Sequence, residues 1–147
     1  RALIEWYVGF HNPCFRGTDG KISPRLWFGH CHIWGYTEHN TWLFIDPQGR
    51  GTGIIVTHMH EEVSDHLEAR FLVCDLILRM PVIEPNFRFP LFGLMTCASI
   101  VGHITGHCAL LPATLRRKLR AAGAEVIHGT ERRSERQGGT PERASAD

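Results

Sequence analysis

Two strand-like segments around a short polar turn constrain this chain more than any other feature. Residues 30–36 and 41–46 are rich in aromatic and β-branched side chains, and the polar stretch Thr37–Asn40 separates them. Such residues favour strands, and a short polar link between two strands favours an antiparallel hairpin. With the turn centred in that link, the pairing is expected to place His30 opposite Asp46.

Further strands are expected where apolar and polar residues alternate or where short apolar runs occur. These segments are residues 3–9, 53–58, 71–78 and 124–128. Residues 12–24 are rich in proline, glycine and aspartate, so a loop is predicted there.

The second half of the chain is expected to carry helices. Apolar side chains recur at helical spacing over residues 97–107, and Thr96 is available as the N-cap. Another helix is predicted from Pro112 to about Gly123, because proline suits a first helical turn. Residues 61–69 are expected to form a short helix. Together these elements predict an α+β fold, in which a small antiparallel sheet packs against a cysteine-bearing helix and a second helix.

Length and composition predict one domain with a tail. The chain has 147 residues, 43% of them apolar, with four Trp and eight Phe. Such a chain can fill a core without a metal or disulfides, so no cofactor is expected. Residues 1–128 are predicted to form this domain. Residues 129–147 have no apolar pattern and are predicted to be flexible or ordered by a partner.

Charge and cysteine content exclude several classes of protein. The formal net charge is +1, which does not favour a nucleic-acid partner. The five cysteines are irregularly spaced, so a disulfide framework is not expected and a reducing compartment is favoured. No apolar run is long enough to predict a membrane span.

Cys97 falls in the first turn of the predicted helix. Unpaired backbone amides at a helix N-terminus favour a thiolate, which is the nucleophilic form of cysteine. A histidine oriented by a carboxylate and facing such a thiol is a common nucleophilic site, and His30 with Asp46 supplies both groups. The alternative is structural: Cys97 as a small core residue, His30 as a strand-edge residue and Asp46 as a turn former before Pro47.

Three short segments carry a resemblance to a known family. They are Phe28–His30, which leads into a strand, Trp42–Pro47, which closes the next, and Thr96–Val101, which opens the helix. The pattern resembles the circularly permuted papain-like fold, a family that includes NlpC-like hydrolases and lecithin retinol acyltransferase relatives. With the helix at Leu111–Leu115 it is also similar to short proteins encoded by tailed bacteriophages. The resemblance covers about residues 26–122.

The resemblance implies roles for three residues. Cys97 would be the nucleophile, His30 the base and Asp46 the orienting group, for hydrolysis or acyl transfer of an amide, ester or thioester through an acyl-cysteine. His32 would be the base if the strand register is shifted. The alternative is a non-enzymatic virion or assembly component that uses the same scaffold to bind phage structural proteins, as an oligomer or within a particle. The implied location is the bacterial cytoplasm or the virion.

A metal site is the chemical rival. Alternating histidines on one strand point to the same face, and imidazoles with a thiol can bind zinc. The residues concerned are His30, Cys31, His32, His58, His60 and His66. The sequence lacks Cys-x-x-Cys and His-Glu-x-x-His motifs, so a bound metal is not expected.

Overall fold

The computed structural model describes residues 2–11, 14–16, 22–24, 29–49, 51–83 and 95–129. Their elements, in chain order, are β1 (Leu3–His11), β2 (Cys14–Arg16), β3 (Ile22–Pro24), β4 (His30–Thr37), β5 (Trp42–Gln48), β6 (Gly51–Thr57), α1 (His60–Val73), β7 (Leu76–Pro81), α2 (Cys97–Thr105), α3 (Pro112–Ala121) and β8 (Glu125–His128). The predicted tail beyond Gly129 lies outside the described residues. Within them, no helix has the length and apolar character needed to cross a membrane.

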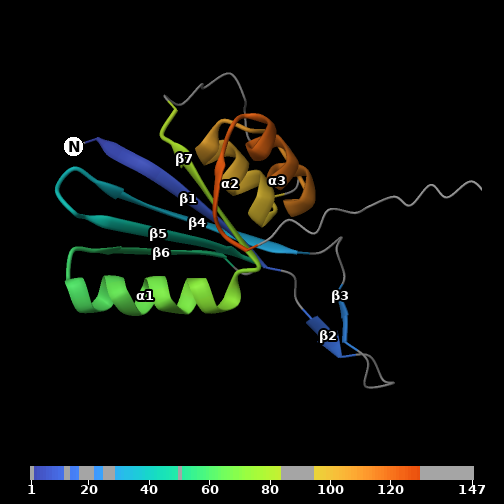
Figure 1. Ribbon diagram of the computed structural model, residues 1–147, viewed down its shortest axis with the longest axis horizontal. Helices are drawn as coiled ribbons and strands as arrows, with labels where there is room; N and C mark the ends of the chain where they lie inside the picture. Colours follow the sequence, from blue (N-terminus) through green and yellow to red (C-terminus); the bar gives the residue numbers. More distant parts are fainter. Residues whose placement is uncertain are drawn as a thin grey trace, which may run out of the picture.

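Six strands form one sheet in the order β6-β5-β4-β1-β7-β8, and every neighbouring pair is antiparallel. Figure 1 shows α2 and α3 on one side of this sheet and α1 on the other. The predicted α+β arrangement, an antiparallel sheet with the cysteine-bearing helix packed on it, is confirmed. The loop predicted at residues 12–24 is wrong in part, because β2 pairs with β3 there in a separate two-stranded sheet.

The core follows the alternation of side chains along the strands. Trp6, Val8 and Phe10 of β1 are buried on the face that α2 and α3 cover. On the opposite face, Trp34 and Phe44 are almost fully buried in a second cluster beside α1. The central strands are therefore covered on both faces.

The strand predicted at residues 71–78 is wrong over its first half. Residues 71–73 form the last turn of α1, and β7 begins only at Leu76. Their β-favouring side chains do not prevent this, because extending an existing helix adds one hydrogen bond for each residue fixed. The backbone N–H of Cys74 makes such a bond to the Arg70 carbonyl at 3.0 Å.

The predicted register of the β4–β5 hairpin is also wrong. The structure pairs Ile33 with Ile45 and Tyr36 with Trp42, so His30 is not directly opposite Asp46. Asn40 adopts a left-handed conformation with φ of 55°. Asparagine tolerates that conformation well, and the turn lies one residue further along the chain than expected.

Helix α2 begins at Cys97 because two reciprocal hydrogen bonds cap its N-terminus. The Thr96 hydroxyl accepts the Ser99 backbone N–H at 3.0 Å, and the Ser99 hydroxyl accepts the Thr96 backbone N–H at 2.8 Å. This reciprocal pair is a capping box. Thr96 is thus confirmed as the N-cap, and Cys97 is the first helical residue.

Gly9 of β1 provides a test of the packing beneath the site. A Cβ atom at Gly9 would lie 2.5 Å from the Cys74 sulfur, 2.7 Å from Nε2 of His32 and 2.9 Å from the Trp34 ring. Gly9→Ala should therefore lower the free energy of unfolding by about 1–3 kcal/mol, measured by urea denaturation. Gly49→Ala is the control, because no described atom lies within 4 Å of a Cβ there. Equal stability of the two variants would contradict the packing.

Candidate active site

The site lies where β4 and β5 separate. Their ladder ends at the pair Ile33 and Ile45, whereas β5 stays paired with β6 as far as Gln48. Within the described chain, residues 30–32 of β4 are therefore paired with β1 alone. Helix α2 packs on β4 and β5 and brings Cys97 to this opening.

His30 and Asp46 meet across the opening. Nε2 of His30 lies 2.6 Å from Oδ1 of Asp46, and the Gln48 side-chain amide donates to Oδ2 of Asp46 at 3.2 Å. Asp46 is diagonal to His30 in the hairpin, a separation that a histidine side chain can span. Nδ1 of His30 is then the ring nitrogen available to Cys97.

The Cys97 sulfur is surrounded by donors. Hydrogen bonds from the Cys31 thiol, the His30 ring and the Cys31 backbone N–H lower the pKa of Cys97 to about 4, although burial raises it. The Cys31 N–H is free for this contact because β5 no longer runs beside that part of β4. Cys97 is thus a thiolate at neutral pH.

The neighbouring groups have the complementary protonation states. The hydrogen bond to Cys97 and the one to Asp46 raise the pKa of His30, against the effect of burial. Burial raises the pKa of Asp46, but hydrogen bonds from His30 and Gln48 outweigh it and the net shift is downward. The pKa of Cys31 is raised by its bond to Cys97 and by burial, so Cys31 remains a protonated donor. These shifts favour a thiolate at Cys97, a protonated ring at His30 and a carboxylate at Asp46.

His32, the other candidate base, has a different partner. Its Nε2 lies 3.3 Å from the Cys74 sulfur, and both side chains are buried. Burial and the nearby Arg70 lower the pKa of His32 to about 4, and burial raises the pKa of Cys74 to about 12. This second cysteine–histidine pair is therefore neutral, and the geometry favours His30 as the ring that serves Cys97.

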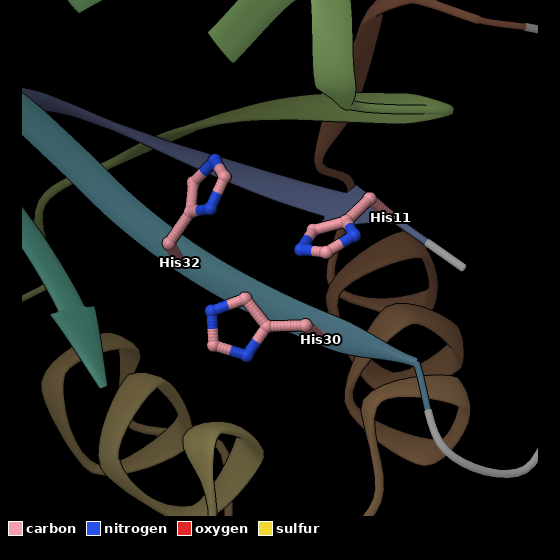
Figure 2. Close-up of side chains that lie close together, drawn as sticks. All are labelled: His11, His30 and His32. Atoms are coloured by element: carbon pink, nitrogen blue, oxygen red, sulfur yellow. The ribbon is translucent and has the colours of Figure 1, made fainter. Parts of the chain in front are cut away.

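The histidines considered for the rival metal site do not all converge. Figure 2 shows His30 and His32 beside His11, and the three rings offer nitrogens within 4.8 Å of one another. Cys31 points to the other face of β4, into the core that α2 covers. His58 and His60 are exposed near the start of α1, and His66 contacts the Phe44 ring.

Two residues of this site were not predicted from the sequence. His11 lies beyond the end of the predicted strand 3–9, but continued alternation from Tyr7 through Gly9 would have placed it on the histidine face. Cys31 was considered only as a metal ligand, and no local signal shows that its N–H and thiol would face Cys97.

Comparisons with protein-family models, with curated proteins and with solved structures give no match to this chain. The chemistry of the site is therefore inferred from the positions and charges of its own side chains. A half-buried thiolate can attack a carbonyl carbon, an adjacent imidazolium can deliver a proton to a leaving group, and a carboxylate can hold the ring in place.

The lowered pKa of Cys97 predicts selective alkylation in mild acid. At about pH 6, brief iodoacetamide treatment should modify Cys97 and leave Cys108 and Cys74 largely unmodified, as measured by peptide mass spectrometry. Cys108 is the control for exposure, since it is more exposed than Cys97. Because the folded-state pKa is lowered, the Cys97 rate should fall only as the pH approaches about 4. Labelling that follows exposure, with Cys108 first, would contradict the thiolate.

Proposed function

We propose that this chain is a cysteine hydrolase or acyltransferase that acts through an acyl-cysteine at Cys97. The observation that carries the proposal is the chain of contacts at the opening between β4 and β5: the Cys97 sulfur bonds to the His30 ring, and Nε2 of that ring lies 2.6 Å from Asp46. The side chains of His30 and Asp46 are 26% and 34% exposed, so a substrate can reach them. The Cys74–His32 pair is enclosed and neutral, so it does not compete for this role.

A permuted papain-like fold accounts for the arrangement. The strand that carries His30 precedes the helix that carries Cys97, the cysteine is the first residue of that helix, and the helix packs on an antiparallel sheet. These features agree with the resemblance of the three sequence segments to that family and to short proteins of tailed bacteriophages. We therefore extend the proposal to a phage-encoded enzyme of this fold.

The first half of the reaction acylates Cys97. The thiolate attacks the carbonyl carbon of an amide, ester or thioester, and the carbonyl oxygen takes the negative charge. First-turn N–H groups of a helix have no intrahelical partner and can stabilise that oxyanion. His30 then gives its proton to the leaving amine, alcohol or thiol as the bond to carbon breaks. Asp46 keeps the ring oriented and stabilises its charged form.

The second half releases the acyl group. The oxygen of water, or the oxygen or nitrogen of an acceptor alcohol or amine, attacks the thioester carbon. Neutral His30 takes a proton from that attacking molecule. The carbon–sulfur bond breaks, Cys97 returns as a thiolate and His30 as an imidazolium. Water as the nucleophile gives hydrolysis, and another acceptor gives acyl transfer.

A binding role in a virion or its assembly is the second candidate, and the edge strand β6 favours it. Ile54, Ile55 and Val56 are 61%, 40% and 62% exposed on this strand, and among the described strands only β5 pairs with it. An exposed edge with β-favouring side chains can pair with a strand of another chain. Phage structural proteins would be the partners in that case.

Acylation of Cys97 separates the two candidates. Wild-type protein incubated with an activated ester, a thioester and an acyl-peptide should gain the acyl mass on Cys97 and release product. Cys97→Ala should do neither, and Cys108→Ala should behave as wild type. His30→Gln should lower the rate by about 10²-fold or more, because it removes the acid–base group.

The opposite result would support the binding role. Unchanged turnover in Cys97→Ala, or no acyl-cysteine in the wild type with any of the three substrate classes, would contradict the proposed enzyme. If Ile55→Lys alone abolished association with a particle, the β6 edge would be the functional surface.

A further inference from the structure

Three histidines from two neighbouring strands form a compact group beside Cys97, and the proposed acyl chemistry uses only one of them. His11, at the end of β1, is paired directly with His30 at the start of β4. His32 follows two residues later on β4, so its side chain points to the same face as His30. Figure 2 shows the three rings side by side. Their ring centroids are 5.1 to 6.1 Å apart.

We propose that His11, His30 and His32 bind a divalent transition-metal ion of the zinc type, and that the bound ion takes His30 away from Asp46. Binding of the ion follows from the three side chains themselves. Its inhibitory effect rests on the function proposed above.

The spacing of the rings fits such an ion after small movements. The nitrogens available as ligands lie within 4.8 Å of one another. A tetrahedral zinc ion has Zn–N bonds of about 2 Å, which places its nitrogen ligands roughly 3.3 Å apart. Small rotations of the rings about their side-chain torsions can close that difference. Three protein ligands leave a fourth position for water.

One of the rings already has an outer partner of the kind that orients a metal-bound histidine. The Cys74 sulfur lies 3.3 Å from Nε2 of His32. A metal-ligating histidine is commonly held through its second ring nitrogen by a hydrogen-bonding group, which fixes the orientation of the ring. Nδ1 of His32 then remains for the ion, and Figure 2 shows this nitrogen facing the other two rings.

The charged groups around the three histidines also affect the binding of a cation. Arg70 is the positive group that acts on His32, and its guanidinium stacks over the aromatic rings of the second core cluster. Asp75, Asp46 and the Cys97 thiolate act on His11. These three negative groups offset the guanidinium, so a dication enters a site that already holds opposite charge.

Competition for His30 follows from the geometry. Figure 2 shows Nδ1 of His30 pointing away from the other two rings, so the ion would take Nε2, the nitrogen that Asp46 engages at 2.6 Å. Nε2 gives up its proton when the ion binds, and the ring then cannot form the imidazolium that protonates the leaving group. The metal would therefore be a reversible inhibitor of the acyl chemistry.

The first experiment measures binding without reference to activity. Chelator-treated protein is titrated with Zn²⁺ by calorimetry, and with Co²⁺ by visible absorption. We expect one ion per chain in the wild type, in Cys97→Ala and in the control His39→Ala, whose histidine is exposed in the hairpin turn. His11→Ala should weaken binding about tenfold or more. The thermal midpoints of His11→Ala and His11→Gln are compared with that of the wild type, so that a folding defect is not mistaken for the loss of a ligand.

Three outcomes would overturn the site. They are no binding by the wild type, equal affinity in His11→Ala and His39→Ala, or a loss in Cys97→Ala as large as the loss in His11→Ala. The last result would mean that the sulfur, rather than the three histidines, holds the ion.

The second experiment tests the competition. At about pH 6, Zn²⁺ should slow the alkylation of Cys97 in the wild type and leave it unchanged in His11→Ala, because a His30 ring that holds the ion at Nε2 no longer faces the sulfur as an imidazolium. Binding without any effect on alkylation would overturn the competition. Failure of the proposed enzyme, seen as full activity of Cys97→Ala, would leave the binding result intact, so the two proposals fail separately.

Discussion

The separation of β4 from β5 beyond Ile33 and Ile45 is the feature on which the rest of the site depends. In a continuous ladder, the Cys31 N–H would face a strand partner and no helix end could approach it. Because the ladder ends there, the first turn of α2 reaches the sheet and the Cys97 sulfur receives that N–H. The capping box of Thr96 and Ser99 fixes where the helix begins. Sheet and helix together place the thiolate.

Two cysteine–histidine pairs in one small domain show how surroundings set chemistry. Cys97 and His30 have partners for their charged forms, in Cys31 and Asp46, and are partly open to solvent. Cys74 and His32 are buried, and the pKa of His32 is lowered further by Arg70. Desolvation disfavours the charged forms in both pairs. Hydrogen bonds to the charged forms outweigh desolvation only in the Cys97–His30 pair. The same residue types thus give one ion pair and one neutral pair.

Much of the fold and part of the site could be predicted from the sequence. Three features are set by residues close together in the sequence. They are the alternation of side chains in β1, the polar turn between β4 and β5, and Thr96 ahead of an apolar helical pattern. The hairpin register was wrong by two residues, yet His30 and Asp46 still meet. A shift of two residues keeps every side chain on its own face, so the two remain on the same surface.

Other features depend on contacts that no local pattern encodes. Residues 71–73 have strand-forming side chains but continue a helix that was already formed. His11 joins the histidine group only because β1 pairs with β4, which are separated by about twenty residues of chain. The donor role of Cys31 depends on where the ladder stops. Each is a consequence of tertiary pairing.

The central claim is that Cys97 and His30 form a thiolate–imidazolium pair. Nitrogen-15 NMR of the His30 ring as a function of pH tests it most directly, because the two ring nitrogens report protonation separately. We expect the pKa of His30 to be raised above the usual range of histidine, and to fall in Cys97→Ala. A His30 ring whose pKa is not raised, or that titrates identically in both proteins, would contradict the thiolate–imidazolium pair.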